Sequence, residues 1–193
     1  LTDSRADAGY IPAARVARGD WVNKLDGYLK GYSKADIQEM WEARQRGEKP
    51  VGTKAKIANL MMTKFYKEMR EDYLIPAGVN IGDLGPDYAH RVYDSYYIST
   101  HQEEFKALLD KYGVNDRVMH SIIANEGNAF GVETGLKTPG FEFGKNRVIN
   151  EIPHAELAPF LQKDFYASIN RYITQATKRG EWAKRFKDDG SGL

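Results

Sequence analysis

The sequence predicts a mostly α-helical fold, a multi-helix single domain with irregular glycine-rich loops and room for one small hairpin. Three observations support this prediction. Apolar residues recur every three or four positions over several long segments, which is the period of an α-helix. Credible N-cap residues precede these segments. The stretches between them are dense in glycine, proline, asparagine and aspartate, which favour turns and loops.

The composition sets the outer limits of the prediction. The chain has 193 residues, 41% hydrophobic and 28% charged, as in an ordinary globular protein. We expect a lead-in segment over 1–18, a helical domain over 19–187 with a subdivision near 76–98 left open, and a flexible tail over 188–193. The absence of cysteine excludes disulfides and thiol chemistry. A net charge of +1 gives no overall case for binding nucleic acid.

Targeting signals are not evident in the sequence. Its apolar runs are much shorter than the roughly 18 residues of a membrane-spanning helix. The first residues have neither the basic start nor the apolar core of a secretory signal. The chain begins with Leu1 where a complete protein would begin with methionine, so we expect it to be a fragment of a longer protein or a trimmed chain.

The first half of the sequence predicts three helices. One covers 20–30 and ends before Gly31. Ser33 and Asp36 form an N-cap with an acidic first turn for a second helix, which runs to about Arg46. Thr53 is the expected cap of a long third helix that stops before Pro76. Its predicted apolar stripe consists of Ile57, Leu60, Met61, Phe65, Met69 and Tyr73.

The second half of the sequence predicts shorter secondary-structure elements and one long terminal helix. Residues 91–98 fit a strand or an aromatic-rich turn. Thr100 with Glu103 makes a capping-box pattern for a helix ending at Gly113, and Asn115 caps another that runs up to Glu126. Residues 127–144 are expected to form an exposed loop or hairpin. His154 is a candidate cap, Pro159 fits the start of a helix, and the last stripe comprises Leu161, Phe165, Ile169, Tyr172, Ile173 and Ala176.

Glu126 is the strongest candidate for a catalytic residue. It closes an apolar helix and precedes a glycine-rich loop, where partial burial would raise the pKa of its carboxyl as a general acid requires. A peptidoglycan-cleaving enzyme of the lysozyme type would need Glu133 or Glu142 as the second carboxylate. The alternative interpretation, an ordinary exposed glutamate in a last turn, is the more frequent one.

Two groups of residues have the composition of a binding surface. Tyr88, Tyr93, Tyr96 and Tyr97 lie near His90 and Arg91, a pattern that fits either peptide, sugar or single-stranded nucleic acid, or simply packing of a loop onto helices. The basic end of the last helix is the best candidate for contact with nucleic acid, although such a face is usually only solvated. Its candidate residues are Lys178, Arg179, Lys184 and Arg185, with Trp182 and Phe186 beside them.

Metal and cofactor sites are not predicted. His90, His101, His120 and His154 are scattered, and none belongs to a recognised metal-binding pair. The glycine-containing strings at 78–85 and 127–131 lack the Lys-Ser/Thr ending of a phosphate-binding loop. We therefore expect no metal and no cofactor.

Two blocks of the sequence resemble segments of the large internal, or ejection, proteins of tailed bacteriophages. The first is AGVNIGDLGPDYAHRVYD over 77–94. The second is NRVINEIPHAELAPFLQKDFYASINRYI over 146–173, with its arginine, its Ile-Pro step and its final Arg-Tyr pair. The resemblance implies an architectural role for residues of the second block, namely Arg147, Pro153, Phe160, Arg171 and Tyr172.

The resemblance also implies a function. It points to a helical, non-enzymatic piece of a large protein that is packaged inside the virion and expelled with the genome toward the host cell envelope or cytoplasm. The expected partners are other virion proteins, other domains of the same chain, further copies of it, or DNA. The two alternatives from the residues themselves are a peptidoglycan-cleaving enzyme using Glu126 and a nucleic-acid-binding helical module.

Overall fold

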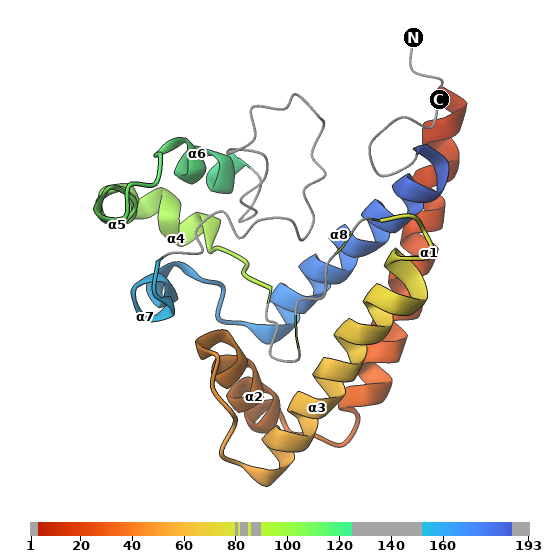
Figure 1. Cartoon of the computed structure of the whole chain (residues 1–193), viewed down its shortest axis with the longest axis horizontal. Helices are drawn as coiled ribbons and strands as arrows, with labels where there is room; N and C mark the ends of the chain where they lie inside the picture. Colours follow the sequence, from red (N-terminus) through yellow and green to blue (C-terminus); the bar gives the residue numbers. More distant parts are fainter. Residues whose placement is uncertain (1–3, 80, 82–84, 86–89, 125–151, 187–193) are drawn as a thin grey trace. The chain divides into compact units, whose positions relative to one another are not determined.

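The fold is mostly α-helical, as the sequence predicts (Figure 1). The computed structural model describes residues 4–79, 81, 85, 90–124 and 152–186. Its residues divide into two compact units, one formed by Leu1–Ala89 with Phe165–Leu193 and the other by His90–Asp164. The predicted loop or hairpin at 127–144 and the tail at 188–193 lie outside the described residues.

In its described residues, the first unit contains four α-helices and one π-helical turn. The N-terminal helix α1 and the C-terminal helix α8 pack side by side in this unit (Figure 1). The elements of this unit are α1 (Ser4–Leu29), α2 (Lys34–Arg46), α3 (Thr53–Glu68), the π-helix η1 (Met69–Leu74) and α8 (Phe165–Phe186).

Helix α1 is longer than the predicted helix over 20–30, because most of the expected lead-in segment is part of it. The lead-in has no apolar period: Ala14 is buried, whereas Ile11 and Val16 are 49% and 67% exposed. A helix whose apolar residues do not form one stripe gives little periodic signal. Pro12 lies inside the helix and adds a local signal against it.

Helix α2 begins and ends as predicted. The Ser33 hydroxyl oxygen accepts a hydrogen bond from the Asp36 N–H at 3.1 Å, and the Asp36 carboxylate accepts one from the Ser33 N–H at 3.0 Å. This reciprocal pair is a capping box. Gly47 ends the helix with φ of 71°, a left-handed conformation that glycine adopts without strain.

Helix α3 is present, but the predicted face and cap are both wrong in part. Gly52 is the N-cap and Thr53 is the first helical residue. Ile57 and Leu60 are 43% and 63% exposed instead of buried. The buried face is rotated toward two alanines and consists of Ala55, Ala58, Met62, Phe65 and Tyr66, followed by buried Met69 at the start of η1.

The core of the first unit is rich in aromatic side chains. Edge-to-face ring contacts join helices that are distant in sequence, and this geometry is favourable for aromatic pairs. These contacts tie α8 to both α2 and α3, and α1 to α3. The pairs are Trp21–Phe65 with centroids 5.6 Å apart, Tyr66–Tyr172 at 5.1 Å and Trp41–Phe165 at 5.6 Å.

The second unit is built from short helices around its own apolar cluster. An isolated antiparallel bridge pairs Tyr93 with Leu161, and Phe105 packs against Phe160 with ring centroids 4.8 Å apart. Buried residues of the cluster also come from α6 and α7. The elements are α4 (Ser95–Thr100), α5 (Gln102–Lys111), α6 (Arg117–Ala124), α7 (His154–Leu157) and the 3-10 turn η2 (Ala158–Phe160).

Two predicted caps in this unit are wrong, and the predicted helix end at Gly113 is right. Thr100 is the last residue of α4, and its hydroxyl donates back to the Tyr97 carbonyl at 2.9 Å, so it does not cap α5. His154 is the first residue of α7, whose N-cap is Pro153. Asn115, the predicted cap of α6, lies two residues before its first residue, and its side chain accepts a hydrogen bond from the Arg117 N–H at 2.9 Å. Gly113 adopts a left-handed φ of 66° at the end of α5.

Leu161 does not belong to the stripe of the last helix, because α8 starts at Phe165 and Leu161 lies in the bridge. The other predicted stripe positions of α8 are buried. No helix within the described ranges has both the length and the apolar content needed to cross a membrane.

Candidate functional site

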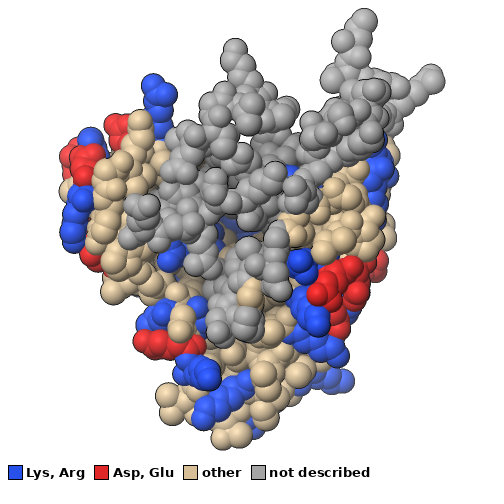
Figure 2. All heavy atoms as spheres, viewed as in Figure 1, with Lys and Arg blue, Asp and Glu red and all other residues tan. Residues whose placement is uncertain are grey.

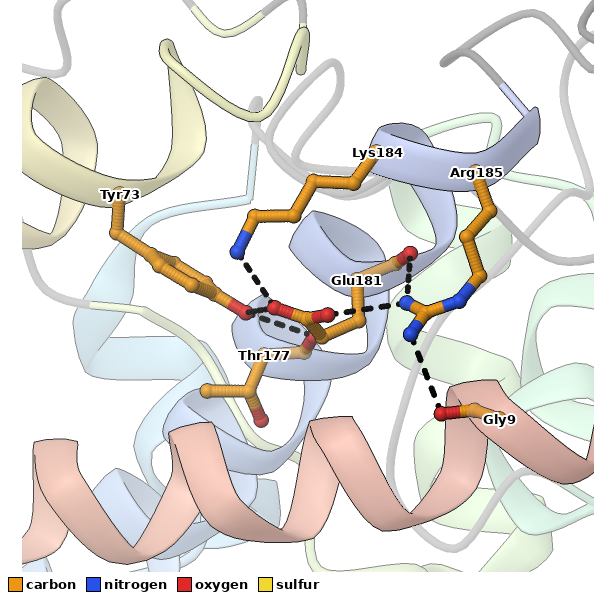
Figure 3. A network of polar contacts seen from close by, with 6 residues as sticks. All are labelled: Gly9, Tyr73, Thr177, Glu181, Lys184 and Arg185. Atoms are coloured by element: carbon orange, nitrogen blue, oxygen red, sulfur yellow. Dashed lines mark hydrogen bonds and ion pairs between the residues drawn. The ribbon is translucent and has the colours of Figure 1, made fainter.

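The most developed polar arrangement in the first unit surrounds Glu181 of α8 (Figure 3). This carboxylate is 7% exposed. Lys184 donates to its Oε1 at 2.6 Å and Arg185 donates to its Oε2 at 3.0 Å. The Tyr73 hydroxyl, from the end of η1, donates to Oε1 at 3.1 Å. Both carboxylate oxygens therefore have charged partners.

The network extends to two further elements of the unit. The Tyr73 hydroxyl also lies 3.1 Å from the Thr177 carbonyl oxygen, one turn back along α8. Arg185 Nη2 donates to the Gly9 carbonyl of α1 at 3.2 Å (Figure 3). Glu181 and its partners thus hold η1 and the N-terminal part of α1 against α8. We call Tyr73, Thr177, Glu181, Lys184 and Arg185 the Glu181 clamp.

The pKa shifts in the clamp favour a structural role for its residues over a role in proton transfer. Burial on its own raises the pKa of Glu181, but hydrogen bonds from Lys184 and Arg185 outweigh it, so the pKa is lowered and the group stays ionised. Burial, followed by the charge of Glu181, raises the pKa of Tyr73 well above its ordinary value. A carboxylate with a lowered pKa and a phenol with a raised one are both poorly matched to acid-base work near neutral pH.

Gly180 makes the close approach of Tyr73 to α8 possible. A Cβ atom at this position would lie 2.6 Å from Cε1 and 2.8 Å from Cζ of the Tyr73 ring. Such distances are far below van der Waals contact, and the ring is confined by its hydroxyl contacts with Thr177 and Glu181. Glycine is therefore required here for packing.

A second ionised cluster joins α1 to α3. The Tyr28 hydroxyl donates to Glu68 Oε2 at 2.6 Å, and Lys24 lies 2.8 Å from the same oxygen. Burial, reinforced by Glu68, raises the pKa of Tyr28 to about 12. Burial would raise the pKa of Glu68, yet the hydrogen bonds from Lys24 and Tyr28 leave it lowered. This cluster, too, serves helix packing.

Arg44 is a buried cation that the sequence analysis did not single out. It is 2% exposed on α2, and its guanidinium donates to the Asn59 carbonyl at 3.0 Å and to the Thr63 hydroxyl at 3.2 Å. It also lies 5.5 Å from the centre of the Tyr66 ring. The only signal in the sequence is the spacing of Asn59 and Thr63, four residues apart on one face of α3.

The four basic candidates for nucleic-acid contact do not form one solvated face. Lys178 is exposed, but Arg179 is only 3% exposed. Lys184 and Arg185 are partners of Glu181. The prediction missed this arrangement, although a signal for it was present: Glu181 lies three and four positions before the two basic residues, a spacing that favours ion pairs within a helix. Trp182 and Phe186 pack together, with centroids 4.3 Å apart.

The aromatic residues predicted to form a binding surface differ widely in exposure. Tyr93 is buried in the apolar cluster, and His90 is buried as well. Tyr97 stacks on His101 with ring centroids 3.9 Å apart. Tyr96 is 78% exposed, so it presents far more free ring surface than Tyr93. Tyr88 lies outside the described residues.

The residues expected to be architectural differ in burial and in position within the fold. Phe160 and Tyr172 are 6% and 4% exposed and pack against aromatic neighbours. Pro153 is the N-cap of α7, and Arg171 is half-buried on α8. Arg147 and the candidate catalytic residues Glu126, Glu133 and Glu142 lie outside the described residues. Among the described residues, no group of three or more histidine, aspartate or glutamate side chains is arranged to hold a metal ion.

The described residues thus define an α-helical fold in which the polar clusters around Glu181, Glu68 and Arg44 join helices. Comparison with models of protein families, with curated proteins and with solved structures finds no match to this chain.

Proposed function

We propose that this chain is a structural and interaction module of an internal virion protein of the phage ejection type, contributing to particle assembly or genome delivery. The proposal rests on the resemblance of 77–94 and 146–173 to such proteins. The observation that supports it best is the use of the described part of the second block in packing. Phe160 and Tyr172, both expected to be architectural, lie in the cores of the two units.

The clamp on α8 is a second support for a structural role. Its ion pairs lie within α8, and hydrogen bonds join them to Tyr73 of η1 and to the Gly9 carbonyl of α1. The shifts in pKa keep Glu181 ionised and Tyr73 protonated. Groups fixed in these states hold helices together over a wide range of pH. A module that must survive packaging with a genome benefits from such stability, whereas a proton-transfer site needs groups that titrate near the working pH.

The proposal is tested first against the enzymatic alternative. Purified peptidoglycan is incubated with the chain, with its Glu126→Gln variant and with a known muramidase, and turbidity is followed. Circular dichroism checks that both forms of the chain are equally helical. We expect the muramidase alone to clear the suspension. Clearing by the chain that is lost in Glu126→Gln would replace the proposal with a lysozyme-like activity.

A further inference from the structure

The segment from Lys49 to Lys67 has an unusual charge pattern. It contains five lysines (Lys49, Lys54, Lys56, Lys64 and Lys67) and no aspartate or glutamate, which gives +5 in a chain whose net charge is +1. The segment comprises the loop after α2 and nearly all of α3. All five lysines are exposed. In Figure 2, blue cationic side chains lie among tan ones at the lower end of the view, where Figure 1 places the hairpin formed by α2 and α3.

Exposed aliphatic side chains lie among these lysines. Val51 at the end of the loop, two residues before α3, is 85% exposed, and Ile57 and Leu60 on α3 are 43% and 63% exposed. Ile57 and Leu60 are three residues apart, so they lie on the same side of the helix, and Lys56 and Lys64 flank them. Lysine stems extend along apolar surfaces while their amino groups stay in water. The result is a mixed cationic and apolar face, which we call the α3 face.

The carboxylates nearest to this face are mostly engaged elsewhere. Glu39 accepts hydrogen bonds from the N–H groups of Val51 and Gly52, at 2.8 and 2.7 Å. Glu68 is held by Lys24 and Tyr28, and its ion pair with Lys64 is long, at 3.8 Å.

The remaining ion pairs of the face are weak or absent. Lys67 lies 3.9 Å from Glu71. Asp36 is mainly paired with Ser33, and Lys54 has only a minor effect on it. Within the described ranges, Lys49, Lys54 and Lys56 form no ion pair. The positive charge of the face is therefore available to an external partner.

We propose that the α3 face docks onto a lipid bilayer surface that contains anionic headgroups. Lysines attract such a surface, and aliphatic side chains between them enter the boundary between headgroups and acyl chains. Phosphates of nucleic acid would pair with the lysines but would leave Val51, Ile57 and Leu60 in water. This docking is peripheral, since no described helix, α3 included, is long and apolar enough to span a membrane. The inference does not depend on the proposed function.

Vesicle co-sedimentation of the full chain tests the inference. Vesicles of phosphatidylcholine alone are compared with vesicles of phosphatidylcholine and phosphatidylglycerol, at low and high salt. One variant, Lys54→Glu/Lys56→Glu, reverses charge on the face; another, Ile57→Ser/Leu60→Ser, removes its apolar residues. We expect binding to the anionic vesicles only, weakened by salt, and a loss of apparent affinity of about tenfold or more in each variant.

Matched controls separate the face from general effects of charge and hydrophobicity. Ile11→Ser/Val16→Ser removes aliphatic residues of similar exposure, 49% and 67%, from α1. Lys30→Glu/Lys34→Glu reverses two exposed lysines outside the segment. Both controls should bind like the unmodified chain, and circular dichroism should show equal helicity throughout.

Several results would overturn the inference. These are no binding to anionic vesicles, equal binding to neutral ones, or equal losses in the control variants. A fourth is unchanged binding by Ile57→Ser/Leu60→Ser, since it would leave electrostatic attraction alone. If a DNA duplex binds in competition with the vesicles and only the lysine variant loses DNA binding, the face is a nucleic-acid surface instead.

Discussion

Individual residues in this protein act mainly through close contacts between helices. Gly180 and Glu181 are neighbours on α8, yet they serve the same contact in different ways. The glycine leaves room for the Tyr73 ring, and the glutamate accepts a hydrogen bond from its hydroxyl. Neither role follows from composition or period, because both depend on Tyr73, which is more than a hundred positions away.

Replacing Gly180 with alanine should destabilise the protein by about 1–3 kcal/mol, because the added methyl group overlaps the Tyr73 ring. Urea unfolding monitored by circular dichroism measures the effect. Gly19→Ala is the matched control, since a Cβ there meets no atom within 4 Å on helix α1. That change should stabilise by up to about 1 kcal/mol. Equal effects of the two substitutions would contradict the packing role of Gly180.

Replacing Glu181 with glutamine should cost about 1–3 kcal/mol at neutral pH, because charged hydrogen bonds with Lys184 and Arg185 are lost. The pKa of Glu181 is lowered in the folded state, so its contribution is complete above the ordinary value of 4.5 and disappears as pH falls through the folded value. The stability difference between the two proteins should therefore shrink below about pH 4.5.

Urea unfolding at a series of pH values provides this measurement, with Glu104→Gln as a control at an exposed position. The control should change stability by less than about 0.5 kcal/mol. A Glu181→Gln penalty that stays constant down to strongly acid pH would show that the carboxylate charge does not stabilise the fold.

At the scale of elements, local signals predict helices well and their faces less well. The ends of α2 could be predicted because capping and the left-handed glycine are encoded within a few residues. The buried face of α3 could not be predicted, because apolar residues recur at helical spacing on two sides of this helix. Large side chains at Ile57 and Leu60 suggested one face, whereas the alanines at 55 and 58 lie on the buried one. The buried face is the one that packs against α1 and α2, and these partners are not encoded locally.

Ser33 and Thr53, the caps predicted from sequence for α2 and α3, can be compared directly by substitution. Ser33→Ala removes the hydroxyl of a capping box and should destabilise by about 0.5–2 kcal/mol. Thr53→Ala should change stability by less than about 0.5 kcal/mol, because Gly52 is the N-cap and Thr53 is the first helical residue. Thermal unfolding of both variants is the measurement. A larger loss for Thr53→Ala would support the cap predicted from sequence instead.

At the scale of the whole molecule, the C-terminal helix α8 packs against the N-terminal helix α1. The first unit is discontinuous, with α8 joining α1, α2 and α3 after the second unit has been completed. The hydrogen bond from Arg185 to Gly9 links positions 176 apart. The amphipathic stripe of α8 was predictable, but its partners were not, since no local signal tells which helix covers a stripe. Lys184 and Arg185 were predicted as a binding face, although Glu181, three and four positions before them, is a local signal for ion pairs within the helix.

The proposed function leads to a prediction about the particle. If the chain belongs to an internal virion protein, its peptides must be inside particles produced by the genome that encodes it. They must also leave the capsid with the DNA. Protease treatment of intact particles should spare them, because the capsid shields them.

Peptide mass spectrometry of purified, protease-treated particles before and after triggered DNA release tests this most directly. We expect peptides from both units in full particles and their loss from emptied ones, with capsid peptides unchanged as the internal control. Absence from full particles, or equal amounts before and after release, would contradict the proposal that this chain is an ejected component of the virion.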